Sequence, residues 1–230
     1  MDDHQLNELV AETADAMERQ VEHFGREDRT IYLTSSFQTQ SVPLLHLISN
    51  LSCASLIHVV LIDTGFLFPE TYLFAQSLKN RFGLKIREVK ANRNYSEQMG
   101  GDERFMFASD LEACCKVNKV DPIEQILHAG DVWISGIRAD QSKVRAKKQT
   151  IEHDERGVVR YHPMLEWTAR DVHRYIAQND LPKHPLEAAG YKSIGCIPCT
   201  RKWSALDLDS DQRGGRWEGS RKTECGLHLS

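Results

Sequence analysis

Cys225 lies near the C-terminus, in the stretch Thr223-Glu224-Cys225-Gly226-Leu227-His228. Arg221 and Lys222 precede this stretch, and His228 ends it. Positive charge close to a cysteine favours its thiolate, which is the nucleophilic form. The pattern therefore indicates a catalytic cysteine. The alternative is a thiol without a catalytic role close to a frayed chain end. The positions of the remaining cysteines help to decide between these two interpretations.

Four cysteines occur in two pairs, Cys114-Cys115 and Cys196-Ile197-Pro198-Cys199. A four-cysteine zinc site needs sulfurs about 3.8 Å apart, whereas adjacent cysteines point in divergent directions. A cubane iron–sulfur cluster presents irons at different corners, so divergent thiolates can each bind one. A thioredoxin-like role of the second pair is disfavoured by its distance from the first strand–helix unit, and a disulfide between Cys114 and Cys115 would be strained. Geometry thus favours one [4Fe-4S] cluster per chain over zinc.

Two cysteines remain if the four paired ones bind a cluster. Cys53 follows an apolar run that ends at Leu51, and we assign it no role. Cys225 is then the free thiol beside basic residues, which favours the catalytic interpretation.

Three polar loops, 34–41, 63–66 and 135–145, could bind an anion. Loop 34–41 has four hydroxyl side chains and precedes a helix N-terminus, which suits phosphate or sulfate. It lacks the lysine and glycines of a Walker loop. Loop 135–145 adds Arg138, Lys143 and Arg145, whose charges suit oxyanions. The alternatives are ordinary capping turns and a solvated charged loop.

These loops follow the strands of a predicted sheet. Apolar runs predict strands at 31–33, 56–62, 84–89, 132–136 and 158–161, and helical spacing or capping predicts helices over 4–22, 43–51, 69–83, 110–120 and from 168. This alternation predicts an α/β fold with a doubly wound, mainly parallel sheet. Ligands bind at the carboxyl ends of such strands, which is where the three loops meet.

Composition limits the classes of partner and location. The net charge of -4 argues against binding to a nucleic-acid polymer. We expect no membrane span, no signal peptide and a cytoplasmic location. We expect a ligand-binding α/β domain with the iron–sulfur site over 1–203 and a mobile tail over 204–230 that carries Cys225, in a chain that forms a homo-oligomer.

Together these segments resemble the thioredoxin-dependent assimilatory sulfonucleotide reductases, which act on adenylyl sulfate or phosphoadenylyl sulfate. The matching segments are Ser35-Ser36-Phe37, Asp63-Thr64-Gly65, Pro69-Glu70-Thr71-Tyr72, Cys114-Cys115, Asn118-Lys119-Val120-Asp121-Pro122, Gly136-Ile137-Arg138, Asp140-Gln141-Ser142, Gly190-Tyr191, Ser193-Ile194-Gly195, Cys196-Ile197-Pro198-Cys199-Thr200-Arg201 and Glu224-Cys225-Gly226-Leu227-His228. Each segment is a weak signal alone, but their order over nearly the whole chain is highly specific.

The resemblance implies an adenine-nucleotide alpha-hydrolase-like fold, related to the ATP pyrophosphatases, whose first loop holds the phosphosulfate. It implies that the Cys225 thiolate attacks the sulfate sulfur, expels the nucleotide and leaves an S-sulfocysteine. Reduced thioredoxin or glutaredoxin would then release sulfite. Positive charge would offset the repulsion between thiolate and substrate. We expect substrate contacts from Ser35, Ser36, Phe37, Gln38, Asp63, Thr64, Gly65, Lys119, Gly136, Arg138, Lys143, Arg145, Arg213, Arg216, Lys222 and His228, and cluster ligands from Cys114, Cys115, Cys196 and Cys199.

The segments disagree on the substrate. The cysteine pairs resemble the cluster-bearing branch, which uses adenylyl sulfate, whereas residues 35–40 and 118–122 resemble the cluster-free branch, which uses phosphoadenylyl sulfate. We expect adenylyl sulfate, with phosphoadenylyl sulfate or both as the alternative. Two rival classes remain. A non-catalytic iron–sulfur sensor would explain the four paired cysteines but not the basic loops or Cys225, and the other rival is a zinc-stapled nucleotide-binding module without catalysis.

Overall fold

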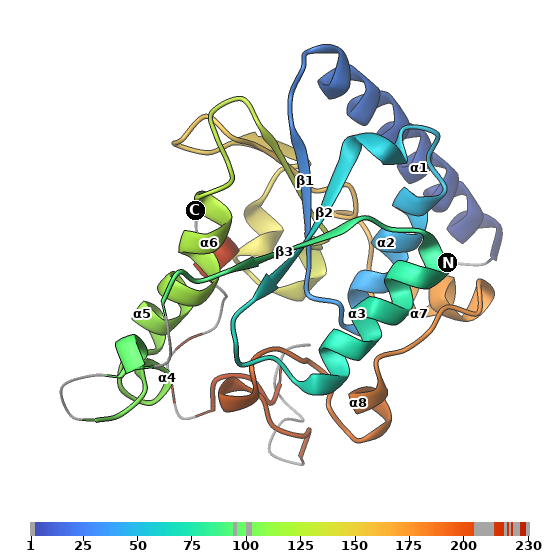
Figure 1. The fold of residues 1–230 in the computed structure, drawn as a ribbon. Coiled ribbons are helices and arrows are strands. Elements are labelled where there is room, and N and C mark those ends of the chain that lie inside the picture. The colour runs from blue at the N-terminus through green and yellow to red at the C-terminus, as the bar shows by residue number, and fades with distance from the viewer. Residues whose placement is uncertain are drawn as a thin grey trace.

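A six-stranded sheet forms the centre of the computed structural model, in the order β3-β2-β1-β4-β6-β5 (Figure 1). The structure describes residues 3–93, 96–99, 103–204, 214–218, 220, 222 and 226–228. The strands are β1 Ile31–Ser35, β2 Ile57–Asp63, β3 Ile86–Lys90, β4 Val132–Ser135, β5 Ile151–His153 and β6 Val159–Tyr161. All neighbouring strands are parallel except β5, which runs antiparallel to β6.

Helices cover both faces of this sheet. They are α1 Asp3–Arg26, α2 Val42–Ser49, α3 Pro69–Phe82, α4 Met106–Ser109, α5 Leu111–Cys115, α6 Asp121–Glu124, α7 Ala169–Gln178 and α8 Pro185–Ala188. A π-helix, Lys116–Val120, connects α5 to α6. No helix in the described ranges is long and apolar enough to cross a membrane.

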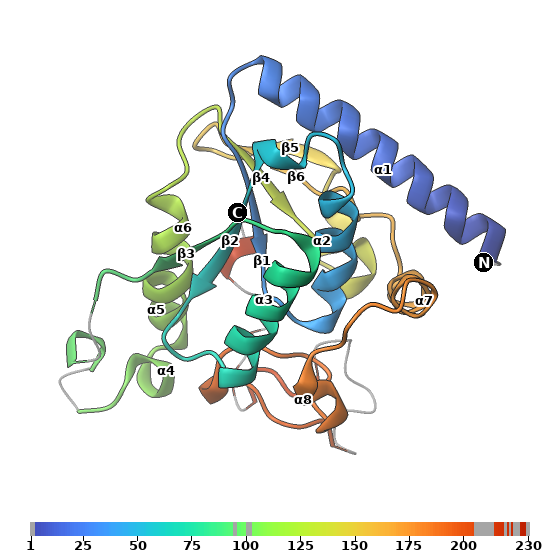
Figure 2. The same ribbon diagram turned by 45° about the vertical axis from the view of Figure 1, so that its right-hand side comes forward.

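Each face of the sheet has its own hydrophobic core. On one face, α1, α2, α3 and α7 pack against alternate residues of β1, β2, β4 and β6, and α1 runs along the outside of this layer (Figure 2). On the other face, the segment around α6 packs against Tyr32, Val60 and Trp133. The period of two along the strands explains why neighbouring residues of β1 enter different cores.

Local sequence signals account for several helix boundaries. Thr168 caps α7 by a reciprocal pair of hydrogen bonds with Asp171, as predicted for this residue. Pro69 occupies the first turn of α3, and Gly83 ends that helix with a φ of 64°, a left-handed conformation that glycine adopts at little cost.

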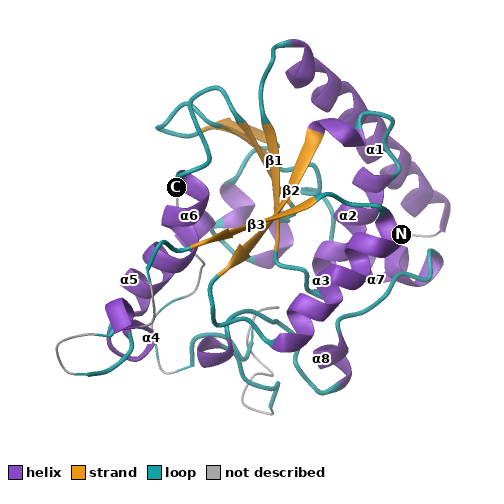
Figure 3. Cartoon of the chain, viewed as in Figure 1, coloured by secondary structure: helices purple, strands orange, loops and turns teal. Residues whose placement is uncertain are grey.

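The predicted doubly wound, mainly parallel sheet is confirmed. The five predicted strands correspond to β1, β2, β3, β4 and β6, while β5, α4, α6 and α8 were not predicted. Within the helix expected over 110–120, α5 changes to a π-helix after Cys115. The loops that follow β1 and β2 gather at one end of the sheet (Figure 3), as the fold requires.

Candidate active site

A cavity of about 190 Å³ opens at the carboxyl ends of β1, β2 and β4. Its lining combines hydroxyls and amides with an apolar wall and a few charged groups. The lining residues are Leu33, Thr34, Ser35, Ser36, Gln38, Gln40, Ser41, Leu44, Leu61, Ile62, Thr64, Leu67, Thr71, Lys119, Ser135, Gly136, Ile137, Gln141, Arg145, Ile194, Gly195, Arg216 and Leu227. The three predicted loops therefore converge on one site.

The charged groups of the cavity have a single sign. Lys119, Arg145 and Arg216 are cations, and no carboxylate occurs among the described residues that line it. The apolar wall suits the flat face of a base, while the cations and hydroxyls suit an anionic group. This composition favours a ligand with an aromatic ring and a negatively charged end.

The loop after β1 turns sharply into the cavity wall. Phe37 has a φ of 51°, an uncommon value for a bulky residue, and its side chain is fully buried in the core. The Phe37 N–H donates to Ser35 Oγ over 3.1 Å. Ser35, Ser36 and Gln38 line the cavity, and Gln38 also accepts a 3.0 Å hydrogen bond from the Ile194 N–H. Phe37 thus anchors the loop from beneath.

The loop after β2 is fixed by Asp63. This buried carboxylate accepts hydrogen bonds from the Tyr72 hydroxyl at 2.5 Å and the Gly65 N–H at 2.9 Å, and Lys90 lies 3.0 Å away. Burial opposes ionisation, but these contacts hold the pKa of Asp63 below its ordinary value. The neighbouring Thr64 lines the cavity and lies 3.3 Å from Cys196 Sγ.

The paired cysteines lie beside the cavity. Cys114 and Cys115 end α5, and Cys196 bridges to Leu67 in the loop after β2. Cys114, Cys115 and Cys196 are buried, and Cys199 is half-buried. No disulfide joins the five cysteines that the structure describes.

Charge interactions show that these thiols and two cavity cations are neighbours. Burial raises the pKa of Cys114, Cys196 raises it further, and Lys119 lowers it. Burial and Cys196 likewise raise the pKa of Cys199, while Lys119 and Arg216 lower it. Lys119 therefore lines the cavity and also lies near enough to Cys114 and Cys199 to lower the pKa of both thiols. Among the described side chains, no three Cys, His, Asp or Glu converge as ligands of a single metal ion.

Arg216 is held in place by the loop that carries the second cysteine pair. Its Nε donates to the Cys199 carbonyl over 3.1 Å, and the backbones at Thr200 and Arg216 form a β-bridge. A Cβ on Gly195 would come within 2.4 Å of the Arg216 guanidinium. Glycine at position 195 thus makes room for this cation.

Other predicted contact residues lie behind or outside the cavity lining. Arg138 is buried, pairs with Asp140 at 3.0 Å and donates to Gln40 at 3.2 Å, so it supports a lining residue. Burial lowers the pKa of Arg138. Lys143 is exposed, and Lys222 pairs with Glu112 of α5.

A further set of predicted residues has no described contact with the cavity. Phe37, Asp63 and Gly65 support their loops, as described above. His228 ends the turn Gly226–His228, next to the lining residue Leu227. Cys225 and Arg213 lie outside the described residues, so their roles stay predictions.

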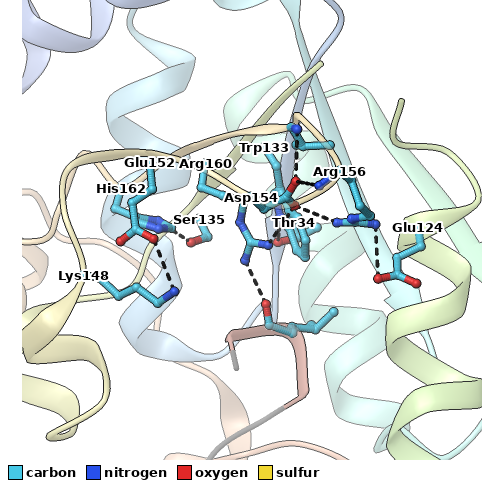
Figure 4. Close-up of polar contacts among 12 residues, drawn as sticks. Thr34, Glu124, Trp133, Ser135, Lys148, Glu152, Asp154, Arg156, Arg160 and His162 are labelled. Atoms are coloured by element: carbon cyan, nitrogen blue, oxygen red, sulfur yellow. Dashed lines mark hydrogen bonds and ion pairs between the residues drawn. The ribbon is translucent and has the colours of Figure 1, made fainter. Parts of the chain in front are cut away.

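Sequence reasoning missed several lining residues, among them Ser135. Its Oγ lies 2.9 Å from Nδ1 of the buried His162 (Figure 4). Burial lowers the pKa of His162 to about 4, so the imidazole is neutral near pH 7. Ser135 begins the predicted anion-binding loop 135–145 and lies in the strand predicted over 132–136, but it was not named as a contact residue. His162 thus fixes the Ser135 hydroxyl at the cavity wall.

Replacing His162 by Asn should reduce the loss of the free energy of unfolding as the pH falls below neutral. Burial lowers the pKa of His162 from 6.5 to about 4. Between these two pH values, His162 is therefore protonated in the unfolded chain but neutral in the folded chain. Stability is therefore full above pH 6.5 and falls as the pH decreases toward 4, by about 2 kcal/mol over the first 1.5 units. Asn still offers Ser135 a hydrogen bond but does not titrate.

Urea unfolding of both chains at about pH 7 and about pH 5 measures this difference. We expect the wild-type chain to lose about 2 kcal/mol more than His162→Asn between the two conditions. An equal loss in both chains would show that His162 is not the titrating group.

Comparison with known proteins agrees with the site. A family model, described as the phosphoadenosine phosphosulfate reductase domain, matches residues 30–202. The chain belongs to this family. Among its curated relatives, the adenosine 5'-phosphosulfate reductase of Oceanobacillus iheyensis is 38% identical over 202 residues, covering 87% of this chain and 82% of that protein. The enzyme of the same name from Lysinibacillus sphaericus is 33% identical over 226 residues, covering 97% and 94%.

Solved structures show the same fold. Phosphoadenylyl-sulfate reductase from Candida auris, in a phosphate complex, has a TM-score of 0.63 at 20% identity and covers 86% of this chain and 96% of its own. Yeast FAD synthetase in complex with FAD has a TM-score of 0.57 at 18% identity, covering 90% and 70%. The predicted adenine-nucleotide alpha-hydrolase-like fold and the reductase family are thus confirmed.

Proposed function

We propose that this member of the phosphoadenosine phosphosulfate reductase domain family reduces adenylyl sulfate to sulfite and AMP. The cavity carries the proposal, because it places three cations and no described carboxylate next to paired cysteines at the carboxyl end of the sheet. Relatives with 33% to 38% identity are named adenosine 5'-phosphosulfate reductases, which supports adenylyl sulfate over phosphoadenylyl sulfate.

The reaction begins with a displacement at sulfur. The Cys225 thiolate attacks the sulfate sulfur, the bond to the bridging phosphate oxygen breaks, and AMP leaves with the electron pair. A new sulfur–sulfur bond remains, as S-sulfocysteine. Lys119 and Arg216 line the cavity and would offset the negative charge on the sulfuryl group and the leaving phosphate.

A dithiol protein completes the cycle. Its thiolate attacks Cys225 Sγ, and sulfite leaves with the electron pair of the broken sulfur–sulfur bond. The second thiol of the partner then resolves the mixed disulfide, so the partner is oxidised and the Cys225 thiol is restored. Reduced thioredoxin, or glutaredoxin, fits this role. Release of the segment that carries Cys225 from the body, part of this proposal, would let the S-sulfocysteine reach that partner.

The paired cysteines fit a [4Fe-4S] cluster. Cys196 raises the pKa of both Cys114 and Cys199, so these three thiols lie close to one another. Four thiolates that each bind a different iron are set wider than the four ligands of one zinc. When bound, the cluster would supply negative charge beside Lys119, and it is not needed as an electron donor for a two-electron displacement.

The function is tested by sulfite release from anaerobically purified protein with reduced thioredoxin. We expect sulfite and AMP from adenylyl sulfate, and slower release from phosphoadenylyl sulfate. Sulfite from phosphoadenylyl sulfate alone would overturn the choice of substrate, and sulfite from neither would overturn the proposed function. We further propose a cytoplasmic location, where reduced thioredoxin is available, and a homo-oligomer, which size-exclusion chromatography with light scattering would detect.

A further inference from the structure

Arg160 is a buried cation that the reaction described above does not use. Its side chain is 3% exposed. It projects from β6 onto the face of the sheet where Trp133 lies, and its guanidinium carbon stacks 3.7 Å from the centre of that ring. Burial lowers the pKa of Arg160 to about 10, which reflects the cost of keeping a charge there.

The described residues around Arg160 accept hydrogen bonds from only some of its guanidinium N–H groups. Asp154 Oδ2 lies 3.8 Å from Arg160 Nη1, beyond hydrogen-bond distance. Neither Nη1 nor Nε makes a hydrogen bond within the described part of the chain. Arg160 Nη2 does donate a 2.8 Å hydrogen bond, to the main-chain carbonyl of Leu227 (Figure 4). Arg160, whose buried charge is energetically unfavourable, thus donates its described hydrogen bond to the C-terminal turn Gly226–His228.

Leu227 is also fixed by packing. Its side chain packs against the core that contains Tyr32, Val60 and Trp133, and it lines the cavity. The neighbouring Gly226 lies so close to Val120 of the π-helix that a Cβ would come within 3.2 Å of Val120 Cγ2. The turn Gly226–His228 therefore has both an apolar and a polar attachment to the body.

The Arg160 contact is connected to the cavity wall. Trp133, on which Arg160 stacks, donates from Nε1 to Thr34 Oγ1 over 2.9 Å. Thr34 lines the cavity and pairs with Ser135 across β1 and β4. One aromatic ring thus joins the cation to the residues that form the cavity.

We propose that Arg160 is a positioning residue, whose hydrogen bond to the Leu227 carbonyl holds the C-terminal turn against the cavity. Leu227 is two residues beyond Cys225, and two residues span at most about 7 Å. A fixed Leu227 therefore limits the distance of the nucleophile from the cavity. This inference rests on the proposed function only in the part that concerns the rate of attack.

The test replaces Arg160 by Met, which keeps the contact with Trp133 but removes the donors. Hydrogen exchange of the peptide containing residues 226–228 should become roughly tenfold faster, as expected for loss of a charge-assisted hydrogen bond. Formation of S-sulfocysteine in a single turnover should slow by a similar factor, with the dissociation constant of adenylyl sulfate unchanged. Arg160→Lys should give an intermediate result.

Arg156→Met is the matched control. Arg156 pairs with the same Asp154, at 2.9 Å, and with Glu124, but it is 35% exposed and has no described contact with the C-terminal turn. We expect no change in exchange at 226–228 and no change in the rate of sulfonation. Thermal denaturation identifies variants that fail to fold, and Arg160→Lys carries the test if Arg160→Met is one of them.

The outcomes separate this inference from the proposed function. Unchanged exchange at 226–228 in a folded Arg160 variant would overturn the contact. Faster exchange with an unchanged sulfonation rate would overturn the positioning role. If the wild-type chain formed no S-sulfocysteine at all, the proposed function would fail, while the exchange measurement would still decide whether Arg160 holds the turn.

Discussion

Cys225→Ser should abolish sulfite release, with a loss of more than about a thousandfold. A serine hydroxyl is not ionised near neutral pH, so the attack on sulfur would lose its nucleophile. Even a slow attack would form a sulfate ester, which a thiol of thioredoxin cannot convert to sulfite. Binding of adenylyl sulfate and iron content should stay within about twofold, since the substitution removes only the nucleophile.

Cys53→Ser is the control for this experiment. Cys53 is buried in the turn after α2, just before the 3-10 helix Ala54–Leu56, and burial together with Glu18 raises the pKa of its thiol to about 11. It is therefore protonated and inaccessible near neutral pH, and we expect Cys53→Ser to retain activity. Incubation of the wild-type chain with adenylyl sulfate and no reductant should leave one sulfonate group on Cys225, located by peptide mass spectrometry. Turnover by Cys225→Ser, or an adduct on Cys53, would show that the nucleophile is misassigned.

The parallel sheet could be predicted because its strands are buried on both sides and read as continuous apolar runs. Local capping signals at Thr168, Pro69 and Gly83 fixed helix ends in the same way. The edge strand β5 could not be predicted, because Ile151-Glu152-His153 has no apolar alternation and its pairing with β6 is a tertiary contact. The four-residue helices α4, α6 and α8 are likewise too short to show a helical period.

Part of the site also follows from sequence alone. Polar residues at strand ends or in the loops that follow, such as Ser35, Thr64 and Arg145, reach the cavity because the carboxyl ends of parallel strands share one edge. Gly195 and Leu227 join them only through long-range packing, which no local pattern encodes. Phe37 was predicted to contact the substrate, but its side chain is fully buried in the core. An aromatic residue in a loop can do either, so the sequence alone could not decide.

Cys196→Ala should cause the second largest loss, of iron and activity together. Cys196 is a proposed cluster ligand, and its sulfur lies 3.3 Å from Thr64, which lines the cavity. The backbone at Cys196 is joined to Leu67 of the same wall by a bridge, and Cys199 holds Arg216 through its carbonyl. Loss of the cluster would therefore disturb Arg216 and the Thr64 hydroxyl, both of which belong to residues that line the cavity.

The measurement is iron content and sulfite release after anaerobic purification, with Cys53→Ala as the matched control. We expect about four irons per chain in the wild type and in Cys53→Ala. Cys196→Ala should give a colourless protein whose activity is reduced by more than about a hundredfold. A loss of this size is expected when groups that stabilise transition-state charge are lost. Because Cys53 is as buried as Cys196, general damage to a core thiol would affect both variants alike. Full iron in Cys196→Ala would remove that residue from the ligand set. Zinc in a colourless wild-type chain would contradict the cluster, and the divergence of Cys114 and Cys115 would then need another explanation.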